Sequence, residues 1–94
     1  MTLAEFLLAR FAESSEYWRA RRVREIDRQS IDRVLADFEA KRRIVAKART
    51  MAEMAAERPD DSFPSNAVAI YEGTMRDFAA AYADHPDYRD EWRP

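Results

Sequence analysis

The residues of this 94-residue chain that are best suited to chemistry gather in one segment, residues 82–94. That segment holds the only histidine, His85, and close to it four carboxylates: Asp84, Asp87, Asp90 and Glu91. Histidine and carboxylate side chains are ligands for divalent metal ions. One histidine beside sequence-local acids is a weak signal, and the spacing lacks the glycine that gives calcium loops their sharp turn. We therefore expect no metal site and no cofactor.

Nucleophilic catalysis has no support in the residue pattern. Every serine lies at a predicted helix start or in a predicted loop, where capping a helix explains it: Ser14, Ser15, Ser30, Ser62 and Ser65. The chain has no cysteine and no glycine-rich phosphate loop. Because no catalytic constellation can be recognised, we expect the protein not to be an enzyme.

The aromatic residues of segment 82–94 favour recognition over catalysis. A chain end is commonly disordered, but this one carries large aromatic side chains beside charges, so we expect it to be docked. The candidate partner-binding residues are Tyr82, His85, Tyr88 and Trp92. The pattern leaves open whether they pack on the chain's own bundle or on another protein.

The net charge of −2 conceals an asymmetry along the chain. Residues 16–49 contain 11 Lys/Arg against six Asp/Glu, whereas the rest of the chain contains five against 12. Either acidic and basic segments pack on each other, within or between chains, or a basic face meets nucleic acid or an acidic protein. Interleaved carboxylates weaken the nucleic-acid interpretation. The candidate basic face consists of Arg19, Arg22, Lys41, Arg42, Arg43 and Lys47.

The elements that position these residues are predicted to be helices, because the chain has one glycine and four prolines. Its length suits a single domain, residues 1–94. No apolar run approaches the roughly 20 residues of a membrane span. No basic region precedes residues 3–8, as it would in a signal peptide. We therefore expect a cytoplasmic protein with no membrane partner.

The N-terminal part is predicted to form one or two helices. Thr2 and Glu5 have the spacing of a capping box, which predicts a helix over residues 2–13. The apolar stripe shifts its register near Ser14, which favours a break at residues 14–15 and a second helix over 16–29. A single uninterrupted helix is the alternative.

Two longer helices are predicted to follow. Ser30 is a good cap for a helix over residues 31–57, which would be roughly 40 Å long. Residues 58–65 are predicted to form a loop with Phe63 tucked beneath it, and 66–83 the next helix. That helix has the most regular apolar seam of the chain: Val68, Tyr71, Met75, Phe78 and Tyr82.

The predicted fold is therefore all-α. A long antiparallel hairpin pairs residues 31–57 with 65–83, because a short loop joins them. The N-terminal helix or helices pack along this hairpin, and the aromatic tail, residues 84–94, docks on the bundle. Gly73 lies off the seam and marks either a close contact or a slight bend.

Three phrases of the sequence carry a family resemblance: residues 6–10 (FLLAR), 33–45 (RVLADFEAKRRIV) and 82–94 (YADHPDYRDEWRP). Together they resemble a family of short actinobacterial and actinophage proteins catalogued as domain of unknown function 6221. The resemblance implies a phage or mobile-element origin, hence the host cytoplasm, and it implies no activity.

The chain departs from the family pattern in three places. It has residues 30–32 (SID) where the family has an Asp-Pro pair, Glu25 where a histidine is frequent, and Ala81 where a proline is frequent. Loss of that proline should let the last long helix run unbroken to the tail.

The functional hypothesis is a small helical interaction or regulatory protein that binds a protein partner and self-associates, with a dimer favoured. Its basis is that the helices offer more apolar seams than a single chain can cover with large side chains, because 17 of the hydrophobic residues are alanine. The alternative is a nucleic-acid-binding module that uses residues 19–49.

Overall fold

The computed structural model describes residues 1–24 and 27–94 and confirms the all-α fold. Three α-helices follow one another, α1 (Leu3–Arg22), α2 (Arg28–Glu57) and α3 (Ser62–Ala80), and a short 3₁₀ helix, η1 (Asp90–Trp92), lies in the tail. The described residues include no strand, and none of their helices is long and apolar enough to cross a membrane. The molecule measures 54 × 26 × 18 Å, so it is an elongated rod.

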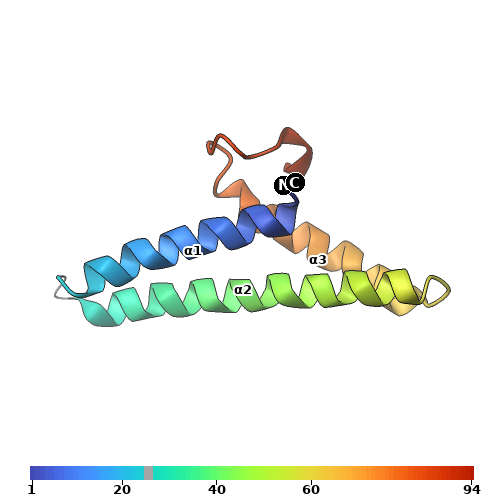
Figure 1. Ribbon diagram of the computed structural model, residues 1–94, viewed down its shortest axis with the longest axis horizontal. Coiled ribbons are helices and arrows are strands. Elements are labelled where there is room, and N and C mark those ends of the chain that lie inside the picture. Colours follow the sequence, from blue (N-terminus) through green and yellow to red (C-terminus); the bar gives the residue numbers. More distant parts are fainter. Residues whose placement is uncertain (25–26) are drawn as a thin grey trace.

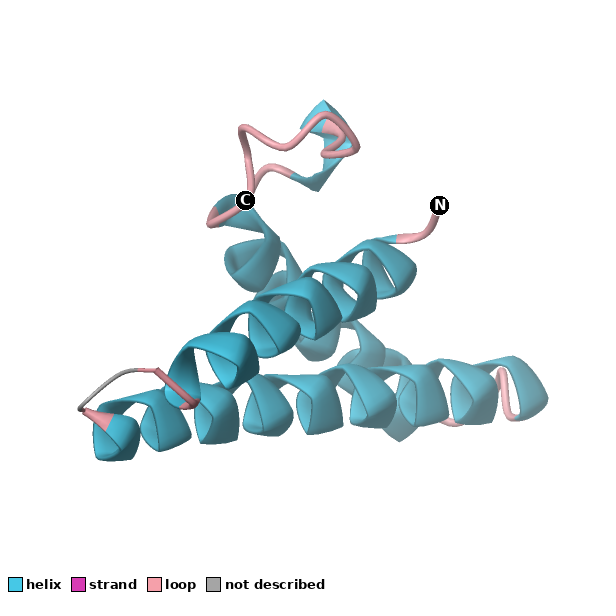
Figure 2. Ribbon diagram, turned by 60° about the vertical axis from the view of Figure 1, so that its left-hand side comes forward, coloured by secondary structure: helices cyan, strands magenta, loops and turns pink. Residues whose placement is uncertain are grey.

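Helix α2 is the backbone of this rod (Figure 1). Helix α1 runs antiparallel along its N-terminal half, and α3 returns antiparallel along its C-terminal half. The expected hairpin of the last two long helices is therefore present, with α1 packed beside it. A second view shows α1 and α3 meeting over the middle of α2, where the tail begins (Figure 2).

Helix α1 begins as expected and continues past the predicted break. Thr2 Oγ1 accepts a hydrogen bond from the Glu5 amide, and Glu5 Oε1 accepts one from the Thr2 amide, each at 3.1 Å. The predicted break at 14–15 is wrong, because α1 continues through both serines. The shift in the apolar stripe has another cause: no residue of α1 after Phe11 is buried, so the second half needs no core-facing stripe.

The prediction of a second N-terminal helix over residues 16–29 is also wrong, because residues 16–22 belong to α1, which ends at Arg22. Residues 25–26 of that prediction, including the family's histidine position, lie outside the described residues. Helix α2 is capped by Asp27, not by Ser30. The Asp27 carboxylate accepts hydrogen bonds from the Ser30 amide at 3.0 Å and from the Ser30 hydroxyl at 2.6 Å, so the cap lies three residues earlier than predicted.

Helix α3 is displaced toward the N-terminus at both of its ends. It starts at Ser62, because Asp61 Oδ1 caps it by accepting a hydrogen bond from the Phe63 amide at 3.0 Å. The loop is therefore shorter than the predicted 58–65. Pro64 fits in the first turn, where its missing N–H leaves no bond unmade. Pro64 is buried there, whereas Phe63 is 66% exposed and not tucked beneath the loop.

The expected extension of the last helix to residue 83 is wrong as well. Helix α3 ends at Ala80 although Ala81 replaces the family's proline. The following residues turn through tighter bonds, from the Tyr82 amide to the Ala79 carbonyl and from the His85 amide to the Tyr82 carbonyl, both 2.9 Å. These turns direct the tail back onto α1. The tail then packs on Phe6 of α1 instead of continuing as a helix.

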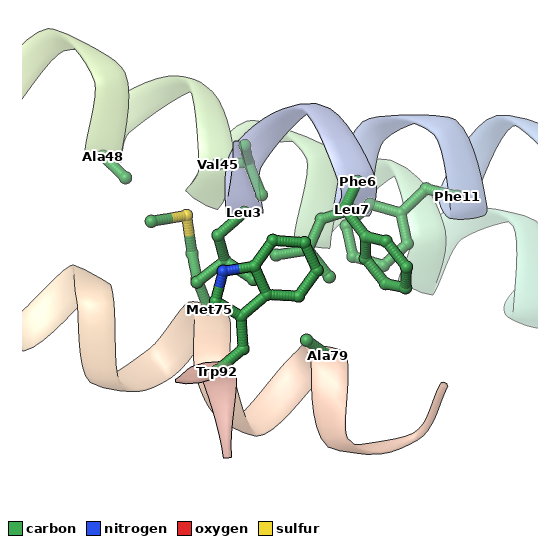
Figure 3. Close-up of a cluster of buried hydrophobic side chains, with 9 residues drawn as sticks. All are labelled: Leu3, Phe6, Leu7, Phe11, Val45, Ala48, Met75, Ala79 and Trp92. Carbon is green, nitrogen blue, oxygen red and sulfur yellow. The ribbon is translucent and has the colours of Figure 1, made fainter. Parts of the chain in front are cut away.

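The hydrophobic core lies where the three helices meet (Figure 3). Met75 and Ala79 of α3 are buried in it, and the seam residues Tyr71, Phe78 and Tyr82 pack against it, as the seam predicted. Outside the core, the described residues include only isolated buried apolar side chains, Ile31 and Pro64. The core residues are Leu3, Phe6, Leu7, Phe11, Val45, Ala48, Met75, Ala79 and Trp92.

Candidate functional site

The aromatic residues of the tail converge on one side chain of α1, the fully buried Phe6. Its ring centroid lies 5.0 Å from that of Trp92, 5.6 Å from His85, and 6.1–6.2 Å from Tyr88 and Tyr82. Three of these four contacts are edge-to-face, the geometry that aromatic pairs prefer. The four candidate partner-binding residues are thus brought together, and the tail docks on its own chain.

Arg10 is the polar centre of the same contact, and it was not among the predicted site residues. It is only 7% exposed and lies 5.2 Å above the Phe6 ring. Its Nη1 contacts both ring nitrogens of His85, with Nδ1 at 3.0 Å, and its Nη2 donates to Glu13 Oε1 at 3.1 Å. The Asp87 carboxylate lies 4.0 Å away. The sequence does contain one indication of this role: Arg10 follows Phe6 by four residues, so both side chains lie on the same face of the helix.

This polar contact orders the tail and does not resemble a catalytic centre. His85 Nδ1 also accepts a hydrogen bond from the Asp87 amide at 3.0 Å, which fixes the imidazole ring within the turn. In the part of the chain that the structure describes, no three His, Asp or Glu side chains are grouped so that they could hold a metal ion. The tail is therefore assigned to the fold, as a cover over the N-terminal half of α1.

The candidate basic residues do not share one face. Arg22 binds Asp32 through Nε at 2.6 Å, which ties the end of α1 to the start of α2, and this hydrogen bond lowers the pKa of Asp32. Lys41 pairs with Asp37 at 3.0 Å and lies 5.6 Å above the Phe78 ring. Lys47 is exposed on α2 and lines neither of the hollows described below.

The remaining candidates border a hollowed strip between α1 and α2, which we call the arginine groove. It consists of two adjoining hollows of about 290 and 340 Å³ that share Arg42. Arg49 also borders it. It lies within the predicted basic segment 19–49 but was not among the residues predicted for the basic face, although its spacing of seven residues from Arg42 places both on one helix face. Four arginines line the groove, namely Arg19, Arg42, Arg43 and Arg49, with two glutamates, Glu16 and Glu39, and six uncharged residues, Leu8, Phe11, Ala12, Ser15, Phe38 and Ala46.

Glu39 organises the arginines on the α2 side of this groove. Its carboxylate accepts two hydrogen bonds from Arg42, at 2.9 and 3.1 Å, and lies 3.9 Å from Arg43 Nη1. The hydrogen bonds from Arg42 lower the pKa of Glu39 below its ordinary value. The result is a prepositioned guanidinium beside an apolar floor, which can receive an acidic side chain in a bidentate manner.

The groove runs along α1 and α2. Leu8, Ala12, Ser15 and Arg19 form its α1 wall at helical spacing, with small residues in the middle. A helix that presents acidic residues at i and i+4 matches such a surface in both shape and charge. The arrangement can bind and orient a ligand.

Comparisons with known proteins complete this description. No curated protein and no solved structure shows significant similarity to the chain. A family model described as "Family of unknown function (DUF6221)" matches residues 1–94. This match spans all three phrases on which the resemblance rests, residues 6–10, 33–45 and 82–94. The chain therefore belongs to the family of unknown function DUF6221.

Proposed function

We propose that this protein is a small interaction protein that regulates a protein partner by binding it, and that it self-associates as a dimer. The observation that supports partner binding is the arginine groove, in which four arginines flank an apolar floor. Arginine is enriched at protein interfaces, where its planar head binds carboxylates and its stem covers apolar surface.

The partner segment that fits the groove best is an acidic amphipathic helix. Its apolar side would lie on Leu8 and Ala46, and its carboxylates would meet Arg42 and Arg49. Because Glu39 already fixes Arg42, little side-chain entropy remains to be lost on binding. The tail is a less suitable first contact, since Trp92 is 6% exposed and already packed on Phe6.

Nucleic acid is the second candidate ligand, favoured by the surplus of arginine over residues 19–49. Against it, Glu16 and Glu39 lie in the same groove. Glu39 neutralises part of the charge of Arg42 and Arg43, so the groove presents a weaker positive potential than its arginines alone would give. A carboxylate can form specific pairs there, whereas a continuous phosphate backbone would meet both glutamates.

The test compares three tagged proteins: the wild type, Arg49→Glu and the matched control Lys47→Glu. Arg49 and Lys47 are both exposed on α2, and only Arg49 lines the groove. We expect a protein captured from actinobacterial lysate by the wild type and by Lys47→Glu, but not by Arg49→Glu. The same captured set with all three proteins would contradict the groove assignment.

A titration with labelled duplex DNA and RNA at low and high salt separates the two candidates. Binding that is strong at low salt, weakens with added salt and is lost in Arg49→Glu would support the nucleic-acid alternative. We expect no such binding. We further propose, from the family resemblance, that the protein originates from an actinobacterium or its phage or mobile element and acts in the host cytoplasm.

A further inference from the structure

We propose that two copies of this chain associate antiparallel along their long axes, so that the acidic end of each rod covers the basic end of the other. The basic end is residues 19–24 and 27–36, formed by the last turn of α1 and the start of α2. The acidic end is residues 50–71, formed by the last part of α2 and the start of α3. The inference specifies the geometry of the proposed self-association and does not depend on the arginine groove.

The first observation is an excess of exposed surface. The chain exposes 6486 Å², whereas a compact monomer of 11.0 kDa exposes about 5,600 Å². The radius of gyration is 15.5 Å, against about 12 Å for a compact domain of this length. The excess of about 900 Å² is close to the roughly 800 Å² that each partner buries in an interface of standard size.

The second observation is where apolar side chains remain exposed. Among the described residues, five large apolar side chains are more than half exposed, and four of them lie away from the central core. Val23, 75% exposed, follows α1 at the basic end, and Tyr17, 55% exposed, lies one to two turns before it. Phe63 and Ile70, 66% and 70% exposed, lie on α3 at the acidic end. Each end thus lacks an apolar cover, because only two helices pack there.

The third observation is charge, and it identifies the occupant as a second copy. Among the described residues, the basic end contains six Lys/Arg against two Asp/Glu, and the acidic end contains one against four. Several of these charges have no ion pair with any residue that the structure describes: Arg24, Arg28 and Arg33 at the basic end, and Glu53, Glu57 and Asp60 at the acidic end. The surplus among the described residues is +4 at one end and −3 at the other, so the rod is complementary to itself.

The register follows from this complementarity. Two rods side by side in parallel would bring like charges together at both ends, whereas antiparallel rods bring opposite charges together at both ends. The antiparallel pair also satisfies a two-fold axis, which closes the assembly at two copies and leaves no end free for a third. The same overlap brings the exposed residues Val23 and Phe63 of opposite copies to the same end of the pair.

The test reverses the charges of each end separately. One variant carries Arg24→Glu, Arg28→Glu and Arg33→Glu, and the other carries Glu53→Lys, Glu57→Lys and Asp60→Lys. All six positions are exposed, and Asp61, which caps α3, is left intact. Circular dichroism establishes that each variant is folded, and light scattering at about 0.1 M salt, where exposed charges still interact, gives the mass.

We expect the wild type at twice 11.0 kDa and each variant alone at 11.0 kDa, with a dissociation constant at least about 100-fold higher, because both ends then meet like charges. An equimolar mixture of the two variants should restore the dimer. A monomeric wild type, dimeric single variants, a mixture that does not associate, or open assemblies larger than two copies would each overturn the inference. Arg49→Glu should keep the dimer while losing the partner, so the two proposals can fail separately.

Discussion

The middle of the molecule and its two ends are built differently. In the middle, three helices and the tail enclose nine buried apolar residues, with Phe6, Leu7 and Val45 among those fully buried. At the ends, two helices lie side by side and large apolar residues such as Val23 and Ile70 remain 70–75% exposed. The difference indicates that the stability of the fold resides in the crossing, the place where the three helices and the tail meet, because buried apolar residues dominate the folding energy. The two ends keep large apolar side chains exposed, which is the surface that the proposed self-association would cover.

The largest expected effect comes from Phe6→Ala, which breaks the crossing. The substitution removes the ring that contacts Tyr82, His85, Tyr88 and Trp92, so we expect the free energy of unfolding to fall by about 3–5 kcal/mol. The matched control is Phe63→Ala at the acidic end, for which about 0.5 kcal/mol or less is expected. Chemical denaturation of both variants as monomers measures the contrast, and equal losses would contradict it.

Trp92→Ala tests whether the tail belongs to the middle. Trp92 is 6% exposed and packs on Phe6 at 5.0 Å, so its removal should cost about 3 kcal/mol. Removal of residues 87–94 should cost at least as much and leave the three helices without their cover. Tyr17→Ala, with a ring that is 55% exposed, serves as the control and should change little. A tail variant with wild-type thermal stability that loses only partner capture would show that the tail is a recognition segment instead.

Gly73→Ala tests an exposed position of α3, and unlike the substitutions above it should stabilise the protein. Gly73 is exposed inside α3, and a Cβ atom built there meets nothing within 4 Å, so neither a close contact nor strain requires glycine. Helix propensity then favours alanine by about 1 kcal/mol. A higher midpoint in thermal unfolding is the expected result, and a lower one would indicate that this face of α3 is covered by a partner copy.

The smallest expected effect is an acid-induced loosening of the basic end. The hydrogen bond from the Ser30 side chain lowers the pKa of Asp27 below its ordinary value of 3.8. A carboxyl group whose pKa is lower in the folded state stabilises that state above the unfolded pKa, and this contribution is lost as the pH falls through the folded value. Amide exchange in the first turn of α2, corrected for intrinsic rates, should therefore accelerate below about pH 4.

Asp27→Ser provides the control for that measurement, because serine caps a helix without titrating. The variant should show a smaller acid dependence at the first turn of α2 than the wild type. An identical acid dependence in both proteins would show that another carboxyl group governs this end.

Local patterns in the sequence predicted the parts of the fold that depend on neighbouring residues. The capping box of Thr2 and Glu5 and the seam around Met75 are each complete within a few turns of helix, so both were predicted correctly. Helix boundaries were harder, because several capping residues compete within a few positions. Asp27 and Ser30 both suit an N-cap, and so do Asp61 and Ser65, and the choice depends on packing elsewhere in the chain.

The candidate site was predicted in part for a related reason. The tail aromatics stood out by their type, but nothing local identifies Phe6 as the surface beneath them. Arg10 was overlooked because an arginine in a helix is usually solvated, and only the tail encloses it. Three of the groove arginines, Arg19, Arg42 and Arg43, were predicted for the basic face. Arg49 was left out of that face because it becomes part of the groove only when Leu8 of α1 packs opposite.

The contact between Arg10 and His85 has a consequence for the order of folding. These residues are 75 positions apart, and closing a loop of that length costs roughly 4 kcal/mol of chain entropy before any contact compensates for it. The α1–α2 and α2–α3 pairs close much shorter loops, so they form first and the tail docks onto a helical framework that already exists. The tail is then absent from the transition state, and substitutions at Trp92 should accelerate unfolding while leaving the folding rate nearly unchanged.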